Sequence, residues 1–136
     1  MSTMFVYNPF TNTFDLVQDL SNLQASPGDL VEAGFNISNN QASPADVTGF
    51  LFANGVVGGF TALVTVAINA TSPLYETFEI RGIQKTSDWF ISITTEGDIS
   101  GINFSITSTG QVRYTSSNYS GFISGIIKFR AITTSV

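Results

Sequence analysis

The chain of 136 residues contains no cysteine and no histidine. The lack of cysteine excludes disulfides, thiolate zinc sites and cysteine nucleophiles. The lack of histidine removes the commonest general base and the commonest ligand for transition metals. We therefore expect neither a metal nor another cofactor, and we expect the chain not to be an enzyme.

Charged residues are also scarce. They make up 11% of the chain, whereas about 25% is usual in soluble domains. No lysine or arginine precedes Arg81, and the formal net charge is −5. Nucleic acid is not an expected partner, because phosphate contacts require clustered lysine and arginine. Sparse surface charge leaves little repulsion between copies, which favours self-assembly.

Long hydrophobic runs are missing as well. The longest, around Phe60–Ile68, is too short to span a bilayer. The N-terminus lacks the basic flank and the long apolar stretch of a signal peptide. We therefore expect synthesis in the cytoplasm without export, and no membrane partner.

The pattern along the chain changes near residue 48. Before it, Pro27-Gly28, Asn39-Asn40 and Ser43-Pro44 are turn and breaker signals. These signals predict that residues 1–48 form a largely extended N-terminal arm. The arm begins with four crowded aromatic residues and an acid: Phe5, Tyr7, Phe10, Phe14 and Asp15.

After residue 48, apolar and polar residues alternate with the period of a β-strand. The clearest case is FTALVTVAIN, which places one apolar set on a single face: Phe60, Ala62, Val64, Val66 and Ile68. DWFISITT, GINFSIT, QVRYTSS and GIIKFRAITT alternate in the same way, and glycine-containing turn signals separate them. The sequence predicts an all-β fold, in which residues 49–136 form an antiparallel, jelly-roll-like β-sandwich.

Acidic residues are the remaining candidates for chemistry. Glu96 and Asp98 flank Gly97, and Asp88 opens the preceding strand. Paired carboxylates could serve a glycosidase, and several oxygen ligands could hold calcium. An acid-Gly-acid sequence at a hairpin tip is ordinarily a solvated turn, which is the interpretation adopted here. Catalysis would require acids among Glu76, Asp88, Glu96 and Asp98 to converge in a cleft with a suitably raised pKa.

Two further sets of residues have alternative interpretations. Trp89 alternates with Ile91 and Ile93 and is interpreted as core, although a tryptophan can also stack on sugar. Together with Asn118 and Tyr119 it is the candidate glycan-binding set. A second set lies on polar strand faces and either solubilises the surface or pairs across a subunit boundary with Glu76, Glu79 or Asp98; it comprises Arg113, Lys128 and Arg130.

The opening stretch resembles a segment near the N-termini of tailed-bacteriophage virion proteins, especially fibre and neck components. The similar residues are YNPFTNTFDLV, from Tyr7 to Val17. In those proteins Pro-x-Thr is commonly followed by Gly-Lys and then Phe-Asp, whereas Asn12-Thr13 stands in the Gly-Lys position here.

Residues 60–136 resemble the terminal β-domain of phage fibre-type proteins. The similar segments include RGIQ, DW, GD, FSIT, GQV, YTS and KFRA. The resemblance implies a homotrimer of sandwiches around one axis, as in tumour-necrosis-factor-like jelly rolls.

These observations predict a structural virion protein, assembled in the host cytoplasm, that is a fibre, a neck appendage or a capsid decoration. The aromatic residues and Asp15 would anchor the arm to other virion proteins, since a segment that orders on binding can wrap a large surface. The alternative for residues 1–20 is a strand and a helix belonging to their own domain. The alternative for the sandwich is a receptor- or glycan-binding module at the tip of such an appendage.

Overall fold

The computed structural model describes residues 3–8, 13–18 and 26–136. The described residues form strands, turns and loops, with no helix among them. Consequently, none of the described residues belongs to a helix long and apolar enough to cross a membrane. The predicted all-β, antiparallel sandwich is confirmed.

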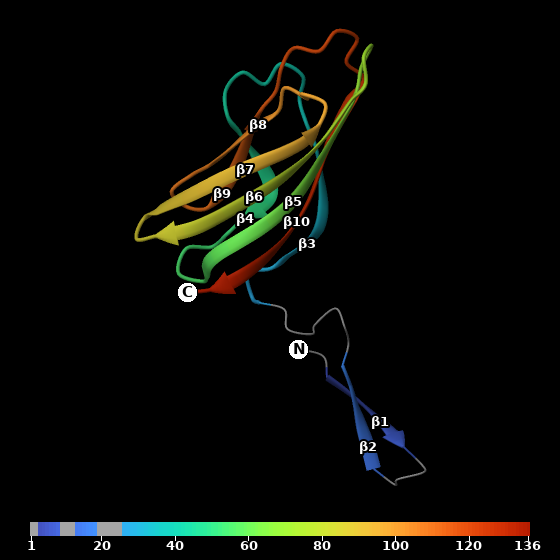
Figure 1. The fold of residues 1–136 in the computed structure, drawn as a ribbon, viewed down its shortest axis with the longest axis vertical. Coiled ribbons are helices and arrows are strands. Elements are labelled where there is room, and N and C mark those ends of the chain that lie inside the picture. The colour runs from blue at the N-terminus through green and yellow to red at the C-terminus, as the bar shows by residue number, and fades with distance from the viewer. Residues whose placement is uncertain (1–2, 9–12, 19–25) are drawn as a thin grey trace.

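Two antiparallel sheets form the sandwich (Figure 1). The larger has the order β3-β10-β5-β6-β7 and the smaller has the order β4-β9-β8. The larger sheet contains β3 (Leu30–Asn36), β10 (Ser124–Ser135), β5 (Val57–Asn69), β6 (Leu74–Lys85) and β7 (Asp88–Gly97). The smaller contains β4 (Ala45–Leu51), β9 (Gln111–Thr115) and β8 (Asn103–Ile106).

The strand order explains why the fold is jelly-roll-like. β10 pairs with β3 and β5, and β9 pairs with β4, so strands from opposite ends of the chain are neighbours in both sheets. β5, β6 and β7 instead follow one another as a meander. Eight strands in two sheets, nested in this way, are typical of double-sheet Greek-key folds.

The alternation predicted for β5 is confirmed by the burial of its side chains. Phe60, Val64 and Ile68 are buried, whereas Leu63 and Thr65 are exposed. β7 follows the same rule less completely, because Trp89 is buried but Ile93 on the same face is 37% exposed. The inner face of β7 is therefore only partly covered.

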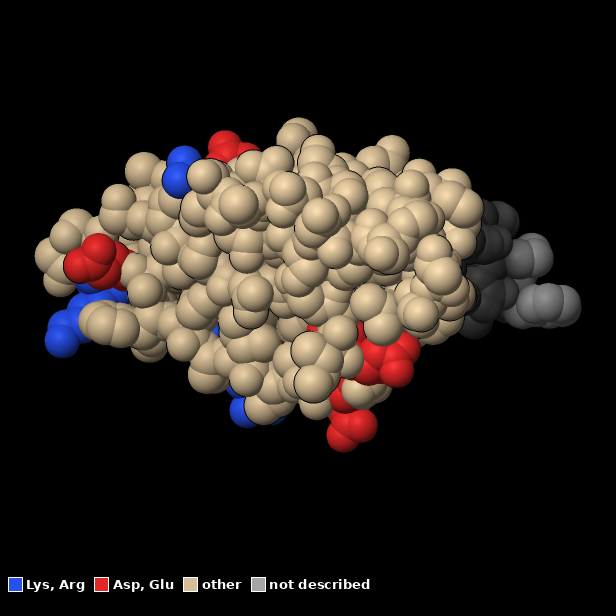
Figure 2. Space-filling model, turned by 90° about the horizontal axis from the view of Figure 1, so that it is seen from above, with Lys and Arg blue, Asp and Glu red and all other residues tan. Residues whose placement is uncertain are grey.

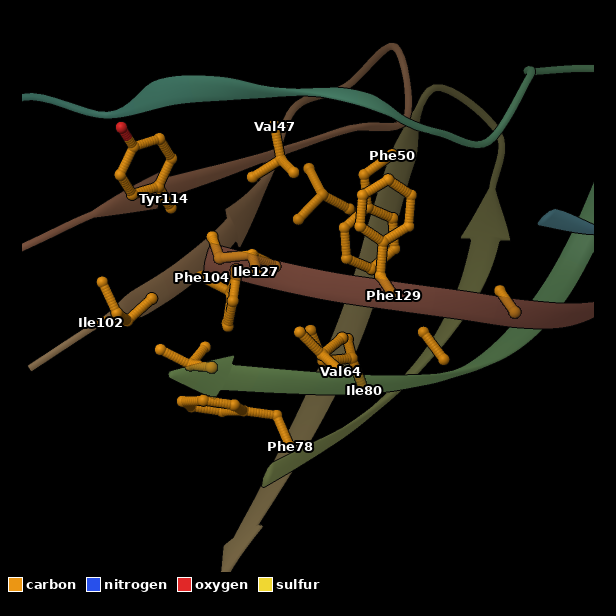
Figure 3. Packing of buried hydrophobic residues seen from close by; sticks show 14 of the residues in the cluster. Val47, Phe50, Val64, Phe78, Ile80, Ile102, Phe104, Tyr114, Ile127 and Phe129 are labelled. Atoms are coloured by element: carbon orange, nitrogen blue, oxygen red, sulfur yellow. The ribbon is translucent and has the colours of Figure 1, made fainter. Parts of the chain in front are cut away.

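Aromatic stacking joins the two sheets at the centre of the core (Figure 3). Phe50 of β4 stacks on Phe129 of β10 with ring centroids 4.4 Å apart. Phe52 stacks in the same way on Phe60 of β5, at 3.8 Å. Each buried ring of this size contributes about 1.5–3 kcal/mol relative to exposure, so these two pairs are a main link between the sheets.

The first two strands form a separate two-stranded sheet. β1 (Thr3–Asn8) pairs antiparallel with β2 (Thr13–Gln18). The register opposes Tyr7 with Phe14 and Phe5 with Leu16. Thr13–Gln18 is a strand, and the alternative of a strand and a helix for residues 1–20 stays a prediction.

The division predicted at residue 48 falls inside β4, and β3 lies before it. β3 forms one edge of the larger sheet through its pairing with β10. Phe35 of β3 also packs edge-on against Tyr114 of β9, with ring centroids 5.5 Å apart. Residues 30–48 therefore contribute strands and core side chains to the sandwich. Their apolar and polar residues alternate, although turn signals interrupt the pattern, so that β3 can pair with β10 and β4 with β9.

Candidate assembly surface

The face of the larger sheet that points away from the core exposes several large apolar side chains. We call it the outer face. It consists of alternate residues of β10, β5, β6 and β7, which the strand register places side by side. Its large apolar side chains are between 52% and 67% exposed: Leu63, Tyr75, Ile83, Phe90 and Ile132.

A groove of about 500 Å³ crosses one end of the outer face. Its floor is made of small side chains, Thr65 and Ala67, and its walls include Tyr75 and Ile126. Lys128 lies on the β10 side of the groove and Glu96 on the β7 side. An apolar floor with opposite charges on its two sides suits a protein surface of mixed character.

The charges of the outer face are divided between its two sides. β10 carries Lys128 and Arg130, whereas Glu79 lies on β6 and Glu96 on β7. Arg81 of β6 forms an ion pair with Glu79, and both side chains are exposed to solvent. In the part of the chain that the structure describes, Lys128, Arg130 and Glu96 form no ion pair.

Arg113 does not belong to this surface. It lies on β9 of the smaller sheet and pairs with Asp46 of β4, Nε to Oδ1, at 2.8 Å. Of the three bases that sequence reasoning grouped together, the structure therefore brings Lys128 and Arg130 together on the outer face and places Arg113 on the opposite sheet.

The carboxylates of Glu76 and Asp98 hold backbone in place. Glu76 Oε1 accepts hydrogen bonds from the Ser100 amide at 3.1 Å and from its hydroxyl at 2.6 Å. Asp98 Oδ2 accepts one from the Tyr75 amide at 2.9 Å. Asp88 begins β7 and Glu96 lies near its end, about 26 Å away at a strand rise of about 3.3 Å per residue. Within the described ranges, no three acidic residues are grouped closely enough to hold a metal ion.

Trp89 is buried at 8% exposure and donates a hydrogen bond from Nε1 to Asn54 Oδ1 at 2.8 Å. Its ring packs near Phe52 and Phe60. The structure thus places Trp89 in the core, at the end of the sandwich where β7 begins.

Asn118 and Tyr119 lie in the loop between β9 and β10, at the other end of β7 from Trp89. Asn118 is exposed and accepts a hydrogen bond from Asn39 Nδ2 at 3.2 Å. The Tyr119 hydroxyl donates to the Ser100 carbonyl at 2.5 Å, and its amide donates to Asn39 Oδ1. The structure therefore brings Asn118 and Tyr119 together without Trp89.

Burial raises the pKa of the Tyr119 phenol above its ordinary value, because the charged form loses hydration. The negative charge of Glu76 raises the pKa further, while hydrogen bonds with Ser117 lower it. Tyr119 thus helps to tie loops together at this end of the sandwich. Figure 2 shows the molecule from above, with a largely uncharged surface and charges at its margin.

The predicted anchoring residues lie in or near the first two strands. Phe5 and Tyr7 belong to β1, and Phe14 and Asp15 belong to β2. Phe10 lies outside the described residues. Anchoring of the arm remains a prediction.

Sequence reasoning missed the apolar residues of the outer face. The signal was present, because Leu63 stands between Thr61 and Thr65 on the face that reads as polar in FTALVTVAIN. Ile132 similarly follows Lys128 and Arg130 on the exposed face of β10. A large apolar residue among polar ones on a strand face indicates an uncovered contact surface when it recurs on neighbouring strands.

Comparison with known proteins gave one similar structure. No protein-family model matches the chain, and no curated protein matches its sequence. The tailspike protein of an Acinetobacter phage is similar over 80% of this chain and 21% of its own, with a TM-score of 0.45 and 14% sequence identity. This chain therefore spans about a fifth of that tailspike's length.

Proposed function

We propose that this chain is a non-enzymatic structural protein of a bacteriophage virion, where it serves as a fibre, neck appendage or capsid decoration. It assembles with copies of itself into a homotrimer and attaches to other virion proteins through its N-terminal arm. The observation that carries the proposal is the apolar outer face, with large side chains exposed on four neighbouring strands.

The outer face supports assembly because large apolar side chains that recur on neighbouring strands of one exposed face are typical of contact surfaces. Leu63, Tyr75 and Ile132 are each more than half exposed. The whole chain carries few charges to keep copies apart. A protein that works as part of an assembly gains from these features, whereas a free monomer would be prone to aggregate.

The place where the arm enters supports its role as an attachment. Asp29 Oδ1 accepts hydrogen bonds from the Thr133 amide and hydroxyl, both at 2.7 Å. This contact joins the start of the sandwich to the end of β10, so the arm enters at the end that also holds the C-terminus (Figure 1). The loops holding Asn39 and Tyr119 lie at the opposite end and would project away from an attached particle.

Assignment to a phage virion is supported by the sequence resemblance of Tyr7–Val17 and of residues 60–136 to phage fibre and neck proteins. A structural role without catalysis also suits the carboxylates, since those of Glu76 and Asp98 are occupied by backbone hydrogen bonds.

The test is the protein content of virions purified from the phage that encodes this chain. We expect mass spectrometry to find the chain in density-purified particles, and gold-labelled antibody to mark one fixed position on them. A chain that is abundant in infected cells but missing from purified particles would refute the proposal.

The arm is tested separately by replacing Phe5, Tyr7 and Phe14 with alanine. We expect the variant to be lost from particles, because it removes the aromatic area that would be buried in neighbouring subunits. The matched control replaces Thr3 and Thr13, which lie in the same strands, with alanine and should be retained. Equal incorporation of both variants would argue against aromatic anchoring.

The second candidate function is a receptor- or glycan-binding module. The observation that favours it is the place of Asn118 and Tyr119 at the end away from the arm, on a surface rich in hydroxyls and amides. Tyr119 also supports its loop, so Asn118→Ala is the cleaner test. A glycan-array signal that Asn118→Ala abolishes would support this function, and a chain that binds no glycan would remove it.

A further inference from the structure

We propose that copies of this chain meet on the outer face, with β10 of one copy lying against β6 and β7 of the next. Lys128 and Arg130 of one copy would then lie close to Glu79 and Glu96 of its neighbour. This inference rests on the proposed function and specifies the surface through which the chain assembles.

The strand register shows that Lys128 does not pair with Glu96 within one copy. Lys128 lies opposite Thr65 on β5, Thr65 opposite Thr77 on β6, and Thr77 opposite Glu96 on β7. The three strand spacings between Lys128 and Glu96 add up to about 14 Å, far beyond ion-pair distance. The base and the acid thus lie on opposite sides of one face, separated by two threonines.

The next row of the face repeats this division. Arg130 lies opposite Leu63, and Leu63 opposite Glu79. In both rows β10 provides the base and the β6–β7 side provides the acid. A neighbour that presents its β6–β7 side to β10 therefore places acid against base in two successive rows.

A second copy of this chain complements the charges of this surface better than a strongly charged foreign protein does. The chain as a whole carries a net charge of −5, so two copies repel over most orientations. The outer face differs, because on it and on the neighbouring strand β3 the bases Arg81, Lys85, Lys128 and Arg130 are equal in number to the acids Glu32, Glu79, Asp88 and Glu96. This face is therefore a place where two acidic copies can approach without net repulsion, and its division of charge selects one orientation.

The apolar side chains supply the burial that the charges alone would not. Leu63 lies between the basic and acidic sides, and Tyr75 borders the groove of about 500 Å³. Ile83, Phe90 and Ile132 extend the apolar area toward the other end of the face. Burying these groups drives association, while the charges set its direction. Repeated around a three-fold axis, the contact closes a homotrimer, whereas a half-turn closes a dimer.

The test uses charge reversal in the full-length chain. One variant carries Lys128→Glu and Arg130→Glu, and the other carries Glu79→Lys and Glu96→Lys. We expect each alone to associate at least about tenfold more weakly, because like charges face one another across the contact. A chain that combines all four reversals should recover association, because acid then faces base at every contact of a closed ring.

The matched control exchanges the pair on the smaller sheet, with Asp46→Arg and Arg113→Glu in one chain. This exchange also alters two exposed charges, but it lies on the opposite side of the sandwich. Its mass in solution should equal that of the wild type. Circular dichroism should show that every variant remains folded.

Light scattering across a range of concentrations distinguishes the outcomes. A wild-type trimer that dissociates in both variants and reassembles in the chain with all four reversals supports the contact and the proposed homotrimer. A wild-type dimer with the same variant behaviour supports the contact and overturns the trimer. A folded wild-type monomer overturns the contact between copies, because the face would then be left to another protein or to residues 1–25. The virion proposal is tested independently, by the presence of the chain in purified particles. Association unchanged in both variants also overturns the contact.

Discussion

The turn between β8 and β9 depends on a glycine that no other residue can replace without strain. Gly110 has a φ of 86°, a left-handed conformation that side chains disfavour. A Cβ at this position would also overlap the carbonyl oxygen of Phe52. The Phe52 amide donates to the Gly110 carbonyl at 2.9 Å, so the two backbones are held close together.

We therefore expect Gly110→Ala to destabilise the fold by more than the backbone strain of about 1–3 kcal/mol. The control is Gly55→Ala, because Gly55 has a φ of 78° but no atom within 4 Å of the added Cβ. Urea unfolding should give Gly110→Ala a much lower free energy of unfolding than Gly55→Ala. Equal losses would mean that the contact with Phe52 adds nothing to the strain.

Ionisation of Tyr119 makes the stability of the fold depend on pH in the alkaline range. Burial raises its pKa in the folded chain above the value of about 10 in the unfolded chain. Between these two values the folded state keeps a proton that the unfolded state has lost. Tyr119 therefore contributes stability that is fully present below about pH 10 and decreases as the pH rises through its folded pKa.

The measurement is the free energy of unfolding between about pH 8 and pH 11 for the wild type and Tyr119→Phe. The variant loses the hydrogen bond to the Ser100 carbonyl, a cost of about 1 kcal/mol at neutral pH. We expect the difference between the two proteins to shrink as the pH rises, because the wild type alone loses the contribution of this phenol. A difference that stays constant would contradict the assignment.

At the scale of elements, β3 is as much a part of the sandwich as the strands that follow it. Its pairing covers one edge of β10, and the segment that follows it buries Ile37. The Tyr114 hydroxyl accepts a hydrogen bond from the Ser38 amide at 2.9 Å. Val47 of β4 is fully buried. These contacts connect residues 30–48 to both sheets.

A chain that begins at Thr48 should therefore fail to fold, whereas one that begins at Ser26 should fold. The shorter chain loses Phe35, Ile37 and Val47, each worth about 2–4 kcal/mol on truncation of a buried side chain. Their sum is comparable with the total stability of about 5–15 kcal/mol for a domain. Circular dichroism and denaturant unfolding check both chains, and a cooperative transition from the chain starting at Thr48 would show that β3 is dispensable.

At the scale of the whole molecule, folding and assembly are expected to be linked. Association stabilises the folded state by mass action, because the unfolded chain has no outer face to offer. The thermal midpoint of the wild type should rise with protein concentration. The variant with Lys128→Glu and Arg130→Glu should show a midpoint that is independent of concentration, measured by scanning calorimetry. A wild-type midpoint that does not change with concentration would contradict this linkage.

The strand alternation by itself determined the fold class. Residues such as Val64 and Phe129 recur with period two, and that period is compatible with a sheet buried on one side. The core position of Trp89 follows from the same pattern, because it alternates with Ile91. These features are local, so they can be read along the chain.

The tertiary structure alone decided which strands lie side by side and hence what each surface contains. The pairing of β3 with β10 joins residues about 90 positions apart, and no local pattern records such a pairing. The same long-range register aligns Lys128 with Glu96 across β5 and β6 and gathers Leu63, Tyr75 and Ile132 on one face. Sequence determines the period of each strand, whereas the composition of a surface depends on which strands become neighbours, and that is settled when the sheets pack to bury the core.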